Sequence, residues 1–186
     1  MGDVAKDAFI FMKVGKHANE TFEAILERKR REYERAGMTF WGYGGTACHP
    51  LRQVQPFARM QIKKQGKIYL LMEPINSNAN PEVAPAKEYS EDGVNWNPIP
   101  DGIVVTGSRY ALVLDEIMPA DLMIPLNDYA VAIGPSQGKP ASDYVNGRVD
   151  KGCFEINSAT PKIDEPRLCK IEYSAQLQDP FAVLLR

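Results

Sequence analysis

The chain has 186 residues, of which 44% are hydrophobic and 25% charged, and its formal net charge is −2. This composition is typical of a globular protein with its own core, and it excludes a global positive field that would draw the chain to nucleic acid or an acidic membrane. No apolar run approaches the roughly 20 residues that a membrane-spanning helix needs, and the N-terminus, with Asp3 and Asp7, is a poor secretory signal. Three cysteines without a CxxC spacing favour neither a disulfide framework nor a zinc site. We therefore expect a reduced, cytoplasmic protein without a metal, a cofactor or a membrane partner.

The first predicted element is a buried strand over residues 9–14, which are apolar or aromatic apart from Lys13. A helix follows, with Asn19 as its expected N-cap and Gly37 as its stop. Apolar residues recur between these two positions at close to 3.6-residue spacing, and glutamates in the expected first turn suit the helix dipole.

A second strand is predicted over residues 38–43 and is followed by a glycine-rich loop. A second helix is expected to begin near Pro56, because proline is tolerated in a first helical turn. The third predicted strand covers residues 67–72. A hairpin over residues 57–72 is the competing interpretation of the same stretch.

This strand–helix–strand–helix–strand order favours right-handed crossovers and neighbouring parallel strands. The loops that follow the first two strands would then leave the same carboxyl edge of the sheet. Ligands of open α/β sheets bind at that edge.

The second half of the chain has a different pattern. Residues 75–102 are rich in Asn, Pro and Ser and are long for a plain connection, which is typical of a lid or binding loop. Six strand-like runs follow, with another long loop over residues 134–152 among them. These runs cover residues 103–106, 110–117, 129–133, 152–156, 168–174 and 181–185. We therefore expect a single α+β domain over residues 1–186, with a βαβαβ-like N-terminal half and a mainly antiparallel β half. A partly closed barrel flanked by helices is a further shape that this order permits.

The most unusual stretch is FWGYGGTACHP, residues 40–50. Alternation along the strand places Phe40 on one face and Trp41 with Tyr43 on the other. Glycines between a strand and a helix start let backbone N–H groups approach an anion, and the helix dipole adds to the attraction. The run matches neither the Walker A motif nor the G-x-G-x-x-G dinucleotide pattern. A tight turn whose glycines only satisfy the backbone geometry is the competing interpretation.

A second loop, VGKHANE at residues 14–20, has a similar order of strand, glycine, basic residue, histidine and helix start. The only two histidines of the chain, His17 and His49, fall in these two loops. We expect a phosphate group to lie between the loops and an aromatic side chain from the long loop to close over a base. The predicted ligand-binding residues are Lys16, Tyr43, Gly44, Gly45, Thr46 and Trp96, together with both histidines.

Three functions follow from these patterns. The first is a cytoplasmic binding protein for a nucleotide or another phosphate-bearing small molecule, which uses loops 14–20 and 42–50. The second is a hydrolase or transferase at the same site, with His17 or His49 as the acid–base group and Cys48 as a nucleophile whose thiolate a helix N-terminus would favour.

The third function is a nucleic-acid reader that recognises a modified base. Its candidate surface is the basic run ERKRREYER, residues 27–35, although mixed charge on an exposed helix is ordinarily a solvated face. A homodimer is the default expectation for the assembly.

Overall fold

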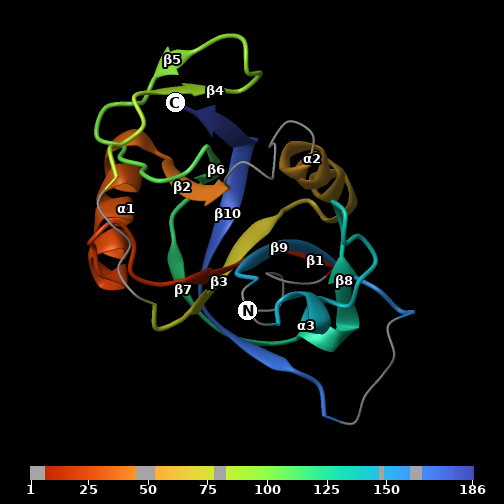
Figure 1. The fold of residues 1–186 in the computed structure, drawn as a ribbon. Coiled ribbons are helices and arrows are strands. Elements are labelled where there is room, and N and C mark those ends of the chain that lie inside the picture. The colour runs from red at the N-terminus through yellow and green to blue at the C-terminus, as the bar shows by residue number, and fades with distance from the viewer. Residues whose placement is uncertain (1–6, 45–52, 78–82, 147–148, 160–164) are drawn as a thin grey trace.

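The computed structural model describes residues 7–44, 53–77, 83–146, 149–159 and 165–186, which form a mixed, ten-stranded sheet with three α-helices (Figure 1). The helices are α1 (Phe22–Ala36), α2 (Val54–Gln65) and α3 (Ala141–Tyr144), with a 3-10 turn at Leu126–Asp128. The strands are β1 (Ala8–Val14), β2 (Thr39–Gly44), β3 (Tyr69–Pro74), β4 (Glu88–Ser90), β5 (Asn97–Pro98), β6 (Tyr110–Leu114), β7 (Met118–Pro125), β8 (Tyr129–Val131), β9 (Lys151–Ile156) and β10 (Leu168–Leu185). The predicted α+β class is confirmed. Within the described ranges, no helix is both long and apolar enough to cross a membrane.

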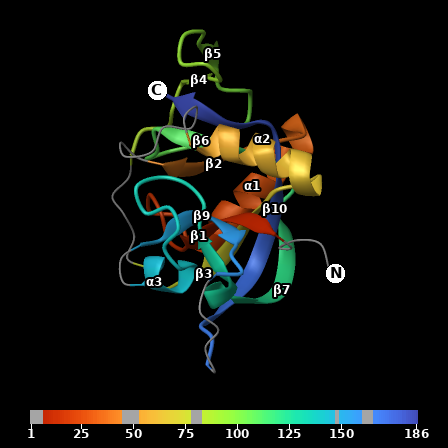
Figure 2. The ribbon, with the colours of Figure 1, turned by 90° about the vertical axis from the view of Figure 1, so that its right-hand side faces the viewer.

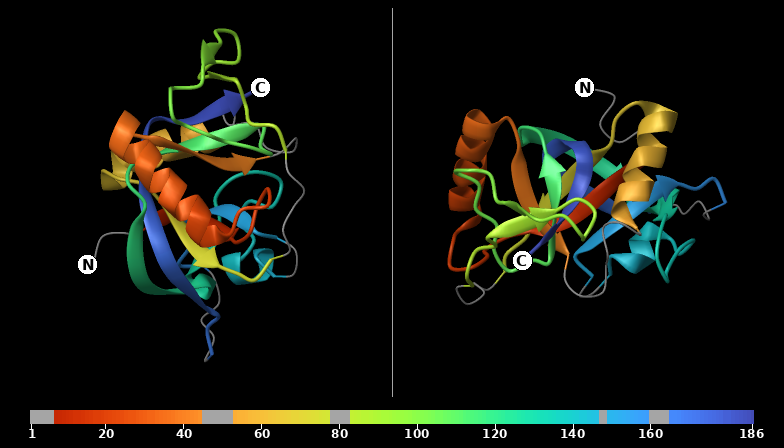
Figure 3. Two further views of the ribbon diagram at one scale, coloured as in Figure 1. Left: turned by 90° about the vertical axis from the view of Figure 1, so that its left-hand side faces the viewer. Right: turned by 90° about the horizontal axis from the view of Figure 1, so that it is seen from above.

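The sheet is organised by the long strand β10. The main path runs β2-β6-β10-β3-β1-β9-β8, with β4 and β7 also paired to β10 and β5 paired to β4. The first part of β10 pairs with β7 and β3, and its last part pairs with β6 and β4. Figures 1 and 2 show β10 curving through the length of the molecule, and Figures 1 and 3 show α1 and α2 on opposite sides of the strands. The sheet is therefore strongly curved without closing into a barrel.

The expected parallel pairing of the first two strands is wrong. β1 is parallel to β3, whereas β2 pairs only with β6 and is separated from β1 by three strands. The YALVL sequence of β6 is buried on both faces and fits between β2 and β10. Strands from the second half of the chain thus insert between strands of the first half, a long-range pairing that the local order of elements does not encode.

Helix α1 begins later than predicted. Its N-cap is Thr21, whose Oγ1 accepts a hydrogen bond of 3.2 Å from the backbone N–H of Ala24. Asn19 does not cap the helix, because it has a φ of 64° and belongs to a tight turn that precedes it. Gly37, with a φ of 69°, ends the helix as predicted.

Helix α2 confirms the helix expected near Pro56 and rules out the competing hairpin over residues 57–72. The proline lies in the first turn, where the missing backbone N–H costs no helical hydrogen bond. Gln55 is buried and donates to the carbonyl oxygens of Ala182 and Pro180 at 2.6 and 3.0 Å, which fixes the start of α2 against β10.

The C-terminal strands differ from prediction in three respects. Residues 168–174 and 181–185 belong to one strand, with a change of register against β6 between Leu177 and Ala182. Residues 103–106 form no strand and contribute only an isolated bridge. Strand β7 was not predicted, because its sequence contains two prolines and lacks a continuous apolar run, and half of its residues are exposed.

Three buried clusters fill the curved sheet, and the central one lies between its two halves. Trp41 and Tyr43 belong to the central cluster, while Phe40 packs into a cluster beside α1, which confirms the predicted alternation along β2. On β1, Ile10 faces the central cluster and Phe11 faces a second one.

A cluster of buried charges joins α1 to its neighbours. Glu32 is 2% exposed, and its two carboxylate oxygens accept hydrogen bonds from Arg28, Lys29, Thr39 and the backbone N–H of Val104. The Lys29 ammonium is 4% exposed and donates to Glu32 at 2.9 Å, to the carbonyl oxygen of Phe40 at 2.5 Å and to that of Val104 at 2.8 Å. Burial lowers the pKa of Lys29 to about 8, although the Glu32 carboxylate opposes this effect.

We expect Glu32→Ala to destabilise the protein by about 3–5 kcal/mol, because it leaves the Lys29 ammonium buried without its carboxylate. The double variant Lys29→Met/Glu32→Leu should lose less stability than Glu32→Ala, since no unpaired charge remains. Urea unfolding measures both effects. Glu34→Ala is the matched control, because Glu34 lies on the exposed side of α1 in a solvated pair with Arg30 and should contribute little. Equal losses for Glu32→Ala and Glu34→Ala would contradict this account.

Candidate functional site

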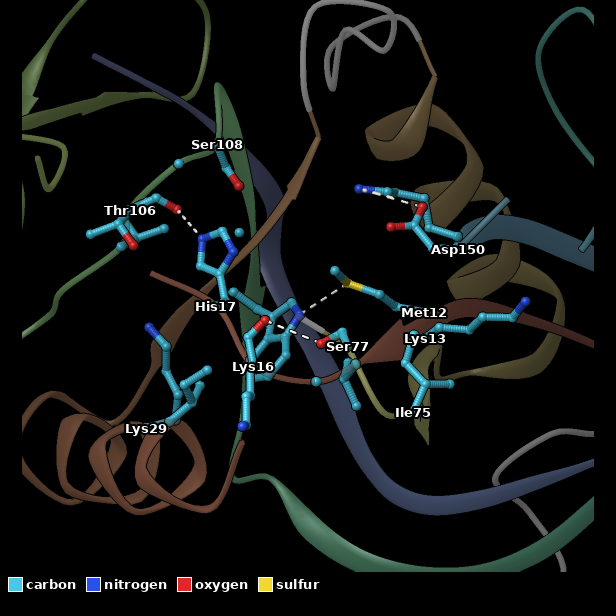
Figure 4. Close-up of a pocket in the computed structure, with 18 of the residues that line it drawn as sticks. Met12, Lys13, Lys16, His17, Lys29, Ile75, Ser77, Thr106, Ser108 and Asp150 are labelled. Atoms are coloured by element: carbon cyan, nitrogen blue, oxygen red, sulfur yellow. Dashed lines mark hydrogen bonds and ion pairs between the residues drawn. The ribbon is translucent and has the colours of Figure 1, made fainter. Parts of the chain in front are cut away.

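A cavity of about 510 Å³ opens beside the carboxyl end of β1 (Figure 4). Its lining comes from β1 and the following loop, from α1, from β2, from residues 75–77 after β3, from residues 104–108 and from the start of β9. The cavity therefore gathers segments that lie far apart in the sequence. Its apolar lining includes Met12, Ile25, Trp41 and Val105.

The curvature of the sheet brings β2 to this cavity, although β2 is not a sheet neighbour of β1. The Trp41 indole N–H donates to the Met12 sulfur at 3.2 Å. The Tyr43 hydroxyl donates to the carbonyl oxygen of Phe11 at 3.4 Å. From β9, the Lys151 ammonium donates to the Tyr43 carbonyl oxygen at 2.8 Å. These contacts hold β2 against β1 and β9 across the curved sheet rather than through a shared parallel edge. Whether loops 14–20 and 42–50 meet stays a prediction, because residues 45–50 lie outside the described residues.

The position of His17 is fixed by a tight turn. The backbone groups of His17 and Glu20 hydrogen-bond to each other in both directions, at 3.1 and 2.8 Å, around Ala18 and Asn19. Both central residues have positive φ, 46° and 64°, as in a two-residue type I′ turn. The imidazole Nε2 of His17 lies 3.3 Å from the carbonyl oxygen of Thr106, so the ring lies between the loop and the opposite wall of the cavity (Figure 4).

Two glycines of the predicted binding loop have packing roles in β2. A Cβ atom at Gly44 would lie 1.4 Å from an atom of the Tyr110 ring, so only glycine leaves room for that ring. A Cβ atom at Gly42 would lie 2.5 Å from the Ser108 hydroxyl oxygen. Gly42 therefore lets Ser108 approach the strand where both residues line the cavity.

Positive charge predominates around the cavity. Among the residues that the structure describes, five cationic side chains and one carboxylate line it, namely Lys13, Lys16, Arg28, Lys29, Lys151 and Asp150. Three of the cations are engaged elsewhere: Arg28 pairs with Glu20 and Glu32, Lys29 with Glu32, and the Lys13 ammonium donates to the Val145 carbonyl oxygen.

Of the two remaining cations, Lys16 is the more available to a ligand, because Lys151 already donates to the Tyr43 carbonyl oxygen. Lys16 is exposed and makes no ion pair with any described residue. Lys151 has only Asp150 as a charged partner in the described chain, with 3.9 Å between the Nζ and Oδ1 atoms. Lys16 also borders a second cavity of about 410 Å³, at the start of α1.

The structure places the predicted site residues as follows. His17 and Lys16 line the cavity, whereas Tyr43 is a buried side chain packed against Tyr110. Trp96 does not line it, because its ring packs on the Arg186 guanidinium, 4.1 Å from the ring centroid, in the projecting β4–β5 hairpin (Figure 2). Gly44 packs against Tyr110 and does not line the cavity, and the other predicted residues, Gly45, Thr46, Cys48 and His49, lie outside the described residues.

Several lining residues were not predicted from the sequence. Ser108, Asp150 and Lys151 come from segments without a recognisable motif. The only local signal for a site was that these residues lie in or beside predicted loops. Asp150 and Lys151 lie within the long loop predicted over residues 134–152, and Ser108 lies between two predicted strands. The approach of Asp150 and Lys151 to β1 depends on the long-range pairing of β9 with β1, and that of Ser108 to β2 depends on the pairing of β6 with β2.

The described cysteines do not provide a nucleophile. Cys153 and Cys169 are both buried, and neither lines the cavity. Burial raises the pKa of the Cys169 thiol to about 12, so the thiolate is disfavoured. No group of three or more His, Cys, Asp or Glu side chains suited to a metal ion occurs among residues 7–44, 53–77, 83–146, 149–159 and 165–186.

We expect Gly42→Ala to destabilise the protein by about 1–3 kcal/mol, because the new methyl group overlaps Ser108. Ser108→Ala alone should have a small effect, since its hydroxyl has no hydrogen-bond partner among the described residues. The double variant Gly42→Ala/Ser108→Ala should recover part of the lost stability, because it lacks the Ser108 hydroxyl oxygen that would lie 2.5 Å from the new Cβ atom. Urea unfolding of all four proteins gives the coupling between the sites. Strictly additive changes would show that the two residues do not meet.

Comparison with known proteins gives no further information about this cavity. No family model matches the chain, and no curated protein or solved structure matches it either. The function is therefore argued from the geometry and charge of the cavity itself.

Proposed function

We propose that the chain binds a small phosphate-bearing molecule, such as a nucleotide, in the cavity beside β1. The observation that carries the proposal is the combination of cationic side chains with an apolar wall in one cavity. The volume of about 510 Å³ lies within the range of roughly 300–1,000 Å³ that is usual for small-molecule sites.

The cationic side of the cavity suits a phosphate group. Lys16 is not paired with a carboxylate in the described chain, and Lys151 is held in place by the Tyr43 carbonyl oxygen. The oxygens of such a ligand would accept charge-assisted hydrogen bonds from these ammonium groups. His17 lies in the same loop as Lys16 and offers a further ring nitrogen at the wall.

The apolar side of the cavity suits a base or a similar flat group. Met12, Ile25 and Val105 supply aliphatic surface, and Trp41 supplies part of an aromatic ring that is 6% exposed. Burial of an apolar ligand group against these side chains would add affinity that inorganic phosphate does not gain.

The alternatives have less support from the described residues. The basic run on α1 is largely neutralised, because Arg28 pairs with Glu20, Arg30 with Glu27 and Glu34, and Arg31 with Glu27. It therefore offers little net charge to nucleic acid. The hydrolase or transferase alternative depends on Cys48 and His49, which the structure does not describe. The cytoplasmic location and the homodimer stay predictions.

We expect nucleotides or other phosphate-bearing compounds to bind wild-type protein, and Lys16→Ala and Lys151→Ala each to weaken binding about tenfold or more, because each removes a charge-assisted contact. Native mass spectrometry of the purified protein identifies a co-purified ligand. Isothermal titration calorimetry with ribonucleoside mono- and triphosphates and inorganic pyrophosphate then measures the affinities.

Lys64→Ala is the matched control, because Lys64 is exposed on α2 and does not line the cavity. The proposal fails if no phosphate-bearing probe binds more tightly than about 1 mM, a weak interaction. It also fails if Lys16→Ala and Lys151→Ala bind the probes as Lys64→Ala does.

A further inference from the structure

The only carboxylate among the described lining residues belongs to Asp150. It lies directly before β9, and its backbone carbonyl oxygen accepts a hydrogen bond of 2.7 Å from the backbone N–H of Lys13 on β1. The backbone of Asp150 is thus fixed to β1, and its side chain is placed at the cavity. Figure 4 shows Asp150 on the opposite side of the cavity from Lys16.

The fold leaves the carboxylate oxygens of Asp150 available as hydrogen-bond acceptors. The charged neighbour of this carboxylate is the Lys151 ammonium, whose Nζ atom lies 3.9 Å from Oδ1, which is longer than a hydrogen bond, and 51% of the Asp150 side chain is exposed. The Lys151 ammonium is instead held at 2.8 Å by the Tyr43 carbonyl oxygen. Within the described part of the chain, the carboxylate oxygens of Asp150 accept no hydrogen bond.

A carboxylate that accepts no hydrogen bond from the fold has a specific consequence in a cavity that binds an anion. It repels a phosphate group, and an ionised carboxylate can only accept hydrogen bonds. A ligand that carries hydroxyl groups as well as phosphate resolves this conflict, because each hydroxyl can donate to the carboxylate. The Ser108 hydroxyl, which also lines the cavity, can donate to or accept from such groups.

We propose that the cavity takes a hydroxyl-bearing phosphate, of the ribosyl or glycosyl phosphate class, and that Asp150 selects it by accepting hydrogen bonds from the sugar hydroxyls. This inference rests on the proposed function and narrows its ligand class. The phosphate is bound by Lys16, and the hydroxyls lie on the side of Asp150 and Lys151, whose charged groups are 3.9 Å apart. A simple polyanion without hydroxyls is disfavoured by the same carboxylate.

The test compares matched probes by isothermal titration calorimetry. The probes are the four ribonucleoside 5′-monophosphates with their 2′,3′-dideoxy counterparts, and ribose 5-phosphate with inorganic phosphate. In the pair that contains the tightest-binding probe, wild-type protein should bind the hydroxyl-bearing probe at least about tenfold more tightly than its hydroxyl-free counterpart. This difference is expected for hydrogen bonds to a charged group. Asp150→Asn should lose most of this preference.

A second readout separates selection from a merely structural role. Because Asp150→Asn removes the repulsion, it should bind the hydroxyl-free probe more tightly than wild-type protein does, whereas structural damage would weaken every probe. Asp101→Asn is the matched control, since the Asp101 side chain is fully exposed and does not line the cavity, and it should keep the wild-type preference.

The outcomes distinguish the two proposals. Equal affinity of wild-type protein for hydroxyl-bearing and hydroxyl-free phosphates, or an unchanged preference in Asp150→Asn, overturns the role of Asp150 and leaves phosphate binding in place. If no phosphate-bearing probe binds, the proposed function fails, and the role of Asp150 fails with it.

Discussion

The cavity depends on the hydrogen bonds of one buried group, the carboxylate of Glu32. It receives four hydrogen bonds, from two side chains of α1, from Thr39 on β2 and from the backbone of Val104. The Val104 carbonyl oxygen in turn accepts from Arg28 and Lys29. Residues 104–108 form one wall of the cavity and contain no regular strand, so these bonds hold a segment that the sheet does not.

The curvature of the sheet supplies the second constraint. Strand β10 pairs with β3 in its first part and with β6 in its last part, so it connects the two halves of the sheet along one continuous strand. This arrangement turns β2 back toward β1, where the Trp41 indole meets the Met12 sulfur. The cavity is formed where the two halves face each other, which explains why its lining comes from such distant parts of the chain.

The sequence predicts the features that depend on local patterns. The β1 strand, both long helices, the alternation along β2 and the place of Lys16 and His17 in a loop at the end of β1 all follow from hydrophobic spacing and from glycine and proline positions. Long-range pairing is not encoded locally, so the insertion of β6 and β10 between β2 and β1 was missed. The burial of Lys29 and Glu32 was missed for the same reason. In the sequence they fit an exposed helix of mixed charge, and only the fold places Phe40 and Val104 over them.

The charges of loop 14–20 and α1 are therefore divided between two tasks. Arg28 and Lys29 stabilise the fold, because they donate hydrogen bonds to Glu20, Glu32 and backbone carbonyl oxygens. Lys16 is left without such a partner in the described chain and lies where the loop meets the cavity. A ligand can draw binding energy only from groups that the fold has not already satisfied. For this reason Lys16 in the loop and the partly exposed Asp150 and Lys151 at the start of β9, rather than the more basic helix, define the chemistry of the site.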